Sequence, residues 1–250
     1  TVTGRMAHTS PNMAQVPAVY SPMGKECRGM WGVSDPDNYS LIGTDASGLE
    51  LRGLAHMMDD PIFIKEILEG DVHTSNQKMA GLDNRDQAKT FIYALMYGAG
   101  AAKIGKIVGG TAREGEELIS KFMKNMPKFS SLKNNLNQTV EKNGVIPGLD
   151  GRTLQVRSPH AALNTLIQGA GAVICKQWLV QINEAYKRKG LDVKLVASIH
   201  DEYQFEVHNK DCEEFGKITK TAIKEVEEIY SFRCPLDSEY KVGKNWADTH

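Results

Sequence analysis

The sequence predicts an α+β fold in which an antiparallel sheet with packed helices is interrupted by a long, mainly helical insertion. Short apolar runs of strand character lie near the two ends, at residues 39–44, 193–199 and 203–207. Between them, apolar residues recur at helical spacing over much of the chain. With 250 residues and 41% hydrophobic content, the chain can bury a sizeable core as one large domain or two closely associated subdomains.

Composition excludes several classes of protein. The sequence has no run of eighteen apolar residues, no basic-then-apolar leader and no lipidation signature, so we expect a cytoplasmic protein without a membrane partner. The cysteines are scattered without a CxxC pair, which argues against a zinc knuckle and against a disulfide framework: Cys27, Cys175, Cys212 and Cys234. The formal net charge of -1 is unusual for a protein that binds nucleic acid, although total charge does not show where basic residues cluster.

The first part of the chain predicts one strand and two helices. Residues 1–40 are rich in Gly, Pro, Ser and Asn and predict an irregular segment with short strands at most. Residues 39–44 form a strand that delivers Asp45 at its end. A helix over 48–58 follows, with an apolar face of Leu51, Leu54, Ala55 and Met58. Asp59, Asp60 and Pro61 end it and start a short helix over 61–69.

The middle of the chain predicts more helices and a hairpin. Residues 83–97 begin with an Asp or Asn cap and end at glycines, which predicts a helix of about four turns. Thr111 and Glu114 form a capping box for a helix that runs toward Pro127, and another helix covers 130–142. Turn residues between two apolar runs predict a hairpin over 145–156.

The last part of the chain predicts the longest helix and a second hairpin. Ser158 and Pro159 provide a cap and a first-turn proline for a helix over about 161–189. The strands 193–199 and 203–207 then form a hairpin whose tip holds His200, Asp201 and Glu202.

Two acids, Asp45 and Asp201, each follow an apolar strand. Hard divalent cations such as magnesium prefer oxygen ligands, and carboxylates from neighbouring strands hold them beside substrate phosphates. The backbone carbonyl of Ala46 can add a ligand. An acid at a strand end also commonly caps a turn or a helix, and spacing alone does not separate these two interpretations.

The helix at 83–97 carries a polar stripe of Arg85, Lys89, Tyr93 and Tyr97. These residues recur every four positions, so each lies about 40° round from the last, and Arg85 and Tyr93 lie about 12 Å apart along the axis. That length is comparable with a nucleoside triphosphate. The opposite side packs inward through Ala88, Phe91, Ile92 and Leu95. The alternative is a solvated basic edge with two buried tyrosines.

The long helix carries a second polar stripe, His160, Asn164 and Gln168, on an otherwise apolar rod. Such a stripe can simply face solvent. Asn and Gln can also bond to the minor-groove acceptors that all correct base pairs share. Gly169 and Gly171 beside the stripe would let a nucleic-acid backbone approach closely.

Several long motifs occur in a fixed order that resembles family A DNA polymerases, especially those of podophages. Three of them resemble the polymerase signatures of that family: DASGLELR at 45–52, RDQAKTFIYALMYGAG at 85–100 and IHDE at 199–202. Four more also resemble the family: TGR at 3–5, PNMAQVP at 11–17, GDVHTSNQ at 70–77 and RSPHAALNTLIQGAGA at 157–172. The resemblance covers essentially the whole chain.

The resemblance implies a role for each candidate residue. Asp45 and Asp201 would bridge two Mg²⁺ ions, with Mn²⁺ as a substitute, and Glu202 would be an accessory acid. Lys89 would be the general acid for the leaving pyrophosphate. His73 would contact the same phosphates, Tyr93 would discriminate weakly against nucleotides without a 3′ hydroxyl, and Glu50 would exclude a ribose 2′ hydroxyl. The implied contacts to primer-template DNA are Arg5, Gln15, Tyr97, Asn164, Gln168 and His200. His73 also has the position of a helix-start cap, and Glu50 that of a surface helix charge.

The resemblance also implies a domain organisation. Residues 1–57 and 164–250 would form the palm of a right-hand polymerase and 58–163 its fingers, while the thumb and exonuclease domains would be absent. The expected function is template-directed DNA synthesis from dNTPs in phage replication, in the host cytoplasm, with a second polypeptide that carries the thumb and 3′-5′ exonuclease regions. One alternative is a polymerase-like DNA-binding subunit that is inactive without its partner chain. Another is a metal-binding protein without nucleic-acid function, which explains the acids but not the Arg85 stripe.

Overall fold

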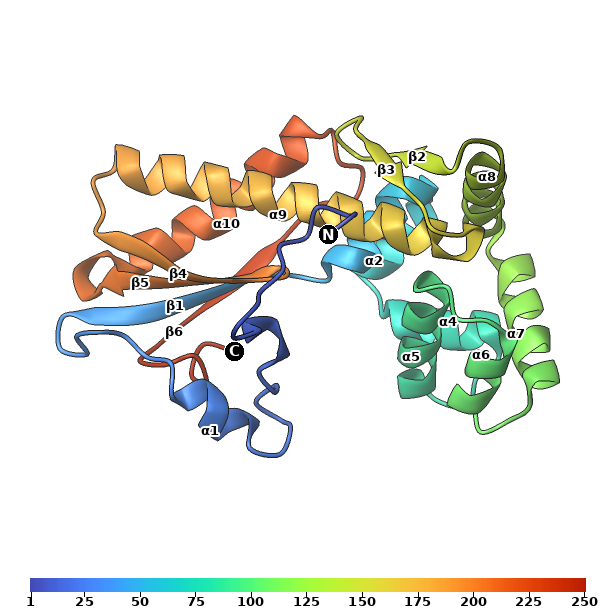
Figure 1. Cartoon of the computed structure of the whole chain (residues 1–250), viewed down its shortest axis with the longest axis horizontal. Coiled ribbons are helices and arrows are strands. Elements are labelled where there is room, and N and C mark those ends of the chain that lie inside the picture. The colour runs from blue at the N-terminus through green and yellow to red at the C-terminus, as the bar shows by residue number, and fades with distance from the viewer. The chain divides into compact units, whose positions relative to one another are not determined.

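The structure, a computed structural model, describes all residues from 1 to 250, and they form two compact units (Figure 1). The sheet unit comprises Thr1, residues 3–49 and residues 171–250, and the helical unit comprises Val2 and residues 50–170. The long helix α9 (Ala162–Arg188) contributes to both units. The predicted α+β class is confirmed.

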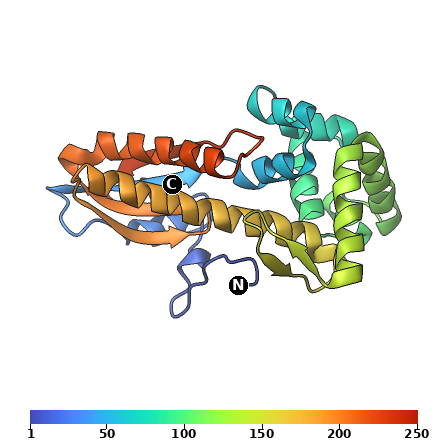
Figure 2. The ribbon, with the colours of Figure 1, turned by 90° about the horizontal axis from the view of Figure 1, so that it is seen from above.

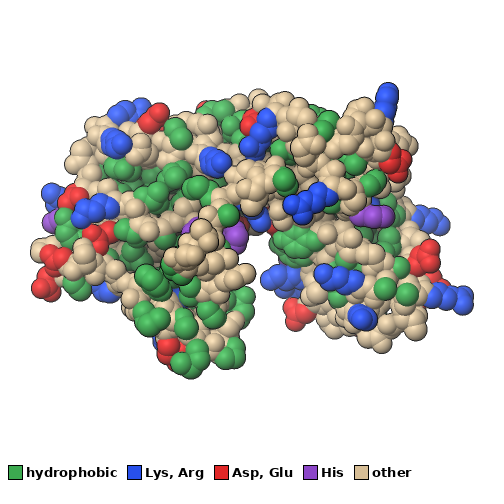
Figure 3. Space-filling view, viewed as in Figure 1, with side chains coloured by type: hydrophobic (Ala, Val, Ile, Leu, Met, Phe, Trp, Pro, Cys, Tyr) green, Lys and Arg blue, Asp and Glu red, His purple; other side chains and the backbone are tan.

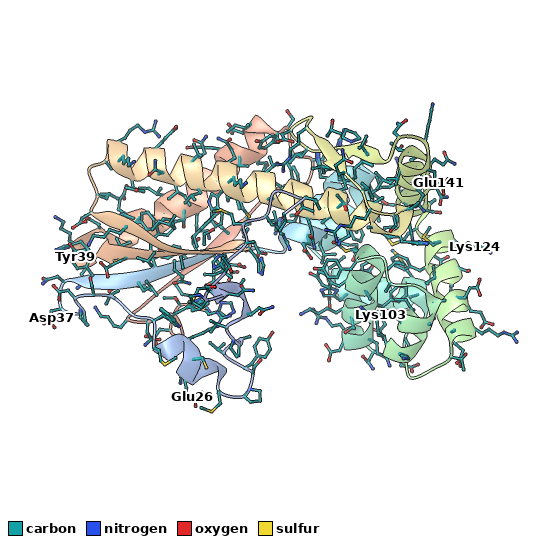
Figure 4. The ribbon with its side chains drawn as sticks, viewed as in Figure 1. Glu26, Asp37, Tyr39, Lys103, Lys124 and Glu141 are labelled. Atoms are coloured by element: carbon teal, nitrogen blue, oxygen red, sulfur yellow. The ribbon has the colours of Figure 1, made fainter.

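The sheet unit contains a four-stranded antiparallel sheet in the order β4-β5-β1-β6. The strands are β1 (Tyr39–Ala46), β4 (Val193–Ile199), β5 (Glu202–His208) and β6 (Ser238–Gly243). Figure 4 labels Asp37 and Tyr39 where the chain enters β1; Asp45 lies near the opposite end of that strand. The helical elements of this unit are η1 (Met13–Gln15), α1 (Gly24–Gly29), the C-terminal part of α9, η3 (Asn209–Asp211) and α10 (Cys212–Ile229).

Successive side chains of the central strands point to opposite faces of the sheet, and both faces are covered. Helices α9 and α10 lie side by side over one face (Figures 1 and 2), where Phe205 of β5 meets Phe215 of α10 with ring centroids 4.8 Å apart. On the same face, the Tyr203 hydroxyl donates to the Cys175 carbonyl of α9 at 2.8 Å. The other face carries a cluster of Leu41, Ile199 and Trp246 that the N-terminal segment covers with Met13, Ala14, Val16 and Val33. Strand β5 is therefore buried on both sides.

The helical unit is built from short helices and a small hairpin. Its elements are α2 (Leu49–Met58, mostly in this unit), α3 (Pro61–Leu68), α4 (Val72–Ala80), α5 (Arg85–Met96), α6 (Ala101–Ile107), α7 (Ala112–Asn125), α8 (Pro127–Asn143), β2 (Val145–Pro147), β3 (Thr153–Gln155) and η2 (Pro159–Ala161). Local signals decide several of these boundaries. The predicted capping box of Thr111 and Glu114 is present at α7, and the Asn84 side chain caps α5.

Some expectations about the elements are wrong. Helix α8 begins at Pro127 instead of residue 130, because proline fits the first turn of a helix. The Ser158 side chain makes no cap hydrogen bond, and a turn of 3-10 helix precedes α9, so His160 lies outside the α-helix. Helices α1, α6 and α10 and strand β6 were not expected from the sequence, and helix α4 was expected only in the alternative role of His73 at a helix start. None of the helices is long and apolar enough to cross a membrane.

Candidate functional site

The tip of the β4-β5 hairpin is tighter than the sequence suggests. Ile199 pairs with Glu202, so His200 and Asp201 alone form the turn and Glu202 belongs to β5. His200 has a φ of 56°, in the left-handed region that glycine normally occupies. A strained turn residue of this kind is typical of a functional loop.

Asp201 is held beside the end of β1 by the backbone. The Ala46 N–H donates to the Asp201 carbonyl oxygen at 3.1 Å, and Asp45 pairs with Glu202 across the β1-β5 ladder. On its other side Asp45 pairs with Glu239 of β6. The sheet therefore gathers four acids around one strand end: Asp45, Asp201, Glu202 and Glu239.

The neighbouring acids perturb the pKa of Asp45. Burial of the carboxylate, followed by the charges of Asp201, Glu202 and Glu239, raises the pKa of Asp45 to about 7. The Asp45 residue still has solvent access and lines a pocket with Glu202, Glu239 and the C-terminal His250. A carboxylate with so high a pKa that solvent still reaches marks a place where a cation is favourable.

Glu202 has a different environment from Asp45. The Glu202 carboxylate is buried and accepts hydrogen bonds from Gln204 and Trp246 at 2.6 Å, while His250 lies 3.2 Å away and Arg28 4.0 Å away. Burial alone raises its pKa, but the bonds to His250, Gln204 and Trp246 outweigh burial and bring the pKa below its ordinary value. Glu202 is therefore ionised, and side chains of the same chain already occupy its carboxylate.

The donor chemistry of this site fits a hard divalent cation. The acids that raise the pKa of Asp45 offer only oxygen ligands, and a divalent ion would relieve their mutual repulsion. No set of three or more His, Cys, Asp or Glu side chains is arranged to hold an ion by itself. Two aspartates would thus need water, a backbone carbonyl or phosphate oxygens to complete a coordination shell, which is how magnesium commonly binds at phosphate sites.

The stripe predicted on α5 is present in the helical unit. Arg85, Lys89 and Tyr97 are exposed and Tyr93 is half-buried. The opposite side of the helix is buried, as expected: Ala88, Phe91, Ile92 and Leu95. Figure 3 shows several Lys and Arg side chains at the surface of this unit, and Figure 4 shows Lys103 projecting from the neighbouring helix α6.

The residues around this stripe form a connected group within the helical unit. The Tyr97 hydroxyl donates to a Glu50 carboxylate oxygen at 2.5 Å, and the Tyr93 ring lies 6.3 Å from the rings of Tyr97 and His73. Burial, Arg85 and Lys89 lower the pKa of His73, so its imidazole is neutral near pH 7. The helical unit thus places basic side chains at one end of the stripe, and aromatic rings with the Glu50 carboxylate at the other.

The predicted DNA contacts have varied surroundings. Arg5 and His200 line a small pocket with Cys175 and Tyr203 in the sheet unit, and Gln15 is exposed on η1. Asn164 and Gln168 are partly buried in the helical unit, and the Asn164 Oδ1 is buried without a hydrogen-bond partner. Such an orphaned acceptor is unusual in a folded protein.

The expected backbone approach at Gly169 and Gly171 needs correction. A Cβ at Gly169 would meet Leu154 of β3 at 2.8 Å, and one at Gly171 would meet Leu49 at 3.5 Å. Apolar side chains of this protein therefore occupy those faces of the helix. The small residues serve internal packing.

Four residues near these sites were not expected from the sequence: Arg28, Asp71, Glu239 and His250. Asp71 carried a local signal, because it precedes His73 and Thr74 at the spacing of a helix cap. Strand pairing brings Glu239 to the carboxylates, the C-terminal segment brings His250 and helix α1 brings Arg28. The sequence has no local signal for these contacts.

The fold is that of a DNA polymerase domain. It superposes on the POL domain of Pol1 from M. smegmatis, solved in complex with DNA primer-template and dNTP, with a TM-score of 0.90 and 22% identity. The superposition covers 99% of this chain and 47% of that one.

Sequence comparison then identifies the family. Residues 1–248 match the profile of DNA polymerase family A, and the chain belongs to this family. It is 43% identical to the DNA-directed DNA polymerases of Enterobacteria phage T3 and Escherichia phage T7, over all of this chain and 40% of each relative. DNA polymerase I of Helicobacter pylori is 26% identical over 99% of this chain and 29% of its own length. The chain thus spans about two fifths of the phage relatives, and the expected resemblance to phage polymerases is confirmed.

Proposed function

We propose that this chain carries the nucleotidyl-transfer site of a template-directed DNA polymerase, which joins dNTPs to a primer 3′ hydroxyl during phage replication. The observation that carries the proposal is the group of acids around Asp45, whose pKa is raised to about 7 at a strand end shared with Asp201. Membership of DNA polymerase family A supports the same conclusion.

In this proposal Asp45 and Asp201 hold two Mg²⁺ ions, for which Mn²⁺ substitutes, and the Ala46 carbonyl adds a ligand. When bound, such ions lower the pKa of an attacking hydroxyl and neutralise phosphate charge. In this proposal the binding of a cation displaces the proton from the Asp45 carboxylate. Glu202 acts as an accessory acid that stiffens the hairpin tip, since its carboxylate is occupied by Gln204 and Trp246.

The α5 stripe would bind the incoming nucleotide. Arg85, Lys89 and His73 contact the triphosphate, and Lys89 donates a proton to the departing pyrophosphate. Tyr93 faces the sugar, and Glu50, which accepts a hydrogen bond from Tyr97, excludes a 2′ hydroxyl. This surface belongs to the helical unit and the acids belong to the sheet unit.

The remaining predicted residues would contact primer-template DNA. Arg5, Gln15 and His200 do so from the sheet unit, and Tyr97, Asn164 and Gln168 from the helical unit. The unpartnered Oδ1 of Asn164 supports this assignment, because a buried acceptor without a partner gains most from a donor on a ligand.

We assign the palm to residues 1–57 and 164–250 and the fingers to residues 58–163. The compact units, which divide the chain after residues 49 and 170, support this assignment to within about eight residues at each boundary. We also propose that a second polypeptide with thumb and 3′-5′ exonuclease regions acts with this chain during DNA synthesis.

An exposed apolar surface on the sheet unit supports a protein partner. Figure 3 shows hydrophobic side chains gathered over α1, where Tyr20, Met23 and Met30 are 89%, 65% and 74% exposed. Beside them, a groove of about 670 Å³ is lined by Met30, Trp31 and other mainly apolar residues. Contiguous apolar surface of this kind marks protein interaction sites.

Primer extension with Mg²⁺ tests the proposal. The assays compare the chain alone, the chain with a thumb-exonuclease polypeptide, and the same assembly with Asp201→Asn or with Asp37→Asn, a charge-matched control on the sheet unit. We expect extension by the assembly and by Asp37→Asn, and a loss of about 1,000-fold or more in Asp201→Asn, the scale of several kcal/mol of lost charge stabilisation. Normal extension by Asp201→Asn, or none by the complete assembly, would refute the catalytic assignment.

A further inference from the structure

The carboxylate of Asp71 connects the starts of two helices in the helical unit. Asp71 is the cap of α4: one oxygen accepts from the His73 N–H at 3.1 Å, and the other accepts from the Thr74 hydroxyl at 2.8 Å. The second oxygen also accepts from Nε of Arg85, the first residue of α5, at 2.6 Å. Arg85 is thereby held by a side chain that is itself fixed at a helix start.

The bond uses only one part of the guanidinium group. Asp71 engages Nε, and the structure gives the two terminal amino groups of Arg85 no hydrogen-bond partner in the protein. Because the guanidinium is a rigid planar fork, fixing Nε also fixes the direction in which those amino groups point. They remain available to an external anion.

The pair contributes little to folding stability. The side chains of Arg85 and Asp71 are 52% and 42% exposed, and solvent-exposed ion pairs add little to folding stability. The hydrogen bond from Arg85 holds the pKa of Asp71 well below its usual range, so the pair stays ionised at neutral pH. Its geometry therefore needs an explanation other than stability.

We propose that Asp71 is a positioning residue for polyphosphate, which orients Arg85 so that its terminal amino groups are already ordered when the triphosphate of a nucleotide arrives. This inference rests on the proposed function of the α5 stripe. Arginine loses side-chain entropy when it is immobilised, and ordering it before binding removes much of that cost from the binding step. The charges of Arg85 and Lys89 both lower the pKa of His73, and His73 and Lys89 complete the anion-binding surface.

If Asp71 were only a competing negative charge, its neutralisation would change polyphosphate affinity in the opposite direction. A carboxylate beside an anion site repels the anion, so if Asp71 were only a competing charge, its neutralisation would tighten polyphosphate binding. If Asp71 positions Arg85, its neutralisation weakens binding although a negative charge has been removed. Asp71→Asn separates the two roles, because asparagine remains a good helix cap.

The test is calorimetric titration of the 250-residue chain with inorganic tripolyphosphate at low salt in EDTA. We expect Asp71→Asn to weaken binding about 5- to 10-fold and Arg85→Ala to weaken it more strongly. Asp86→Asn removes the same charge one residue from Arg85 without touching its guanidinium group, and should change the Kd less than about 2-fold.

A double-mutant cycle distinguishes positioning from a purely structural effect. Arg85→Lys keeps the charge but lacks the fork, so Asp71→Asn should cost little further affinity in that background. Tighter or unchanged binding in Asp71→Asn, while Arg85→Ala binds weakly, would overturn the positioning role alone. Equal costs of Asp71→Asn in the wild-type and Arg85→Lys backgrounds would also overturn it. Unchanged binding in Arg85→Ala would instead remove the phosphate contact of the proposed function, and the positioning role with it.

Discussion

The backbone amide of Ala46 donates a hydrogen bond to the carbonyl oxygen of Asp201 at 3.1 Å. This bond joins the end of β1 to the tip of the β4-β5 hairpin without using either carboxylate. Substitution of the Asp45 or Asp201 side chain should therefore leave the strand ends together. Variants at these positions report on the chemistry of the acids more than on folding.

Asp45→Asn should stabilise the metal-free protein above neutral pH. Because the pKa of Asp45 is raised to about 7, its favourable contribution is complete below pH 3.8 and is lost as pH rises through about 7. Solvent reaches Asp45, so we expect an effect of about 1 kcal/mol at pH 8, or about 2–4 °C in Tm. Thermal unfolding in EDTA at pH 4 and pH 8 measures it.

The expected advantage of Asp45→Asn is small at pH 4 and grows until about pH 7. Added Mg²⁺ should raise the Tm of the wild-type protein more than that of the variant. An Asp45→Asn protein whose Tm matches wild type at both pH values would mean that the acids do not repel one another.

Tyr97→Phe should relax the exclusion of ribonucleotides. The Tyr97 hydroxyl donates to Glu50 at 2.5 Å, and losing this bond removes one contact that orients the carboxylate we place beside the sugar. We expect discrimination against ribonucleotides to fall roughly 10-fold in Tyr97→Phe and further in Glu50→Ala, on the scale of one charged hydrogen bond. Incorporation efficiencies of matched ribo- and deoxyribonucleotides provide the measurement, with Glu69→Ala as a surface control. Equal rejection by wild type and Glu50→Ala would count against a steric gate.

Tyr93→Phe should reduce incorporation of dideoxynucleotides relative to normal substrates. The phenol hydroxyl supplies a hydrogen-bonding group where a nucleotide without a 3′ hydroxyl lacks one, so its loss should cost at least about 10-fold. Competition between dideoxy and normal nucleotides in primer extension measures the ratio, and Tyr186→Phe in the sheet unit serves as a control. An unchanged ratio would remove Tyr93 from the sugar contact.

His200→Gly should stabilise the protein and lower its affinity for primer-template DNA. His200 has a φ of 56°, and glycine relieves about 0.5–1 kcal/mol of left-handed strain there. Ser231, with a φ of 46°, is the matched control: Ser231→Gly should stabilise similarly and leave primer-template affinity unchanged. Tm values and binding isotherms together decide the matter, and full DNA affinity in His200→Gly would argue that the residue is only a turn.

Local sequence patterns predicted the elements that depend on interactions between residues close together in the sequence. The α5 stripe follows from four-residue spacing, and the cap at Asn84 and the box at Thr111 follow from side chains that bond to nearby backbone. Helix α10 also carries a local signal, since Phe215, Ile218, Ala222 and Val226 recur at helical spacing and are buried.

Other features depend on contacts between distant parts of the chain. Strand β6 is short and largely polar, and it becomes a strand because its residues pair with β1. Glu239 faces Asp45 only through that pairing. The environment of Glu202 depends on Trp246 and His250 from the C-terminal segment. No local sequence signal connects these residues, which is why the electrostatics of the acids had to come from the structure.

Mn²⁺ binding monitored by electron paramagnetic resonance shows whether Asp45 and Asp201 together hold the catalytic metal ions. The titration uses the complete assembly with primer-template DNA and a dNTP, and compares wild type with Asp45→Asn, Asp201→Asn and the control Asp37→Asn. We expect two ions per site in wild type and Asp37→Asn, and the loss of at least one ion, or at least about 10-fold weaker binding, in each aspartate variant. Undiminished stoichiometry and affinity in both Asp45→Asn and Asp201→Asn would contradict this assignment.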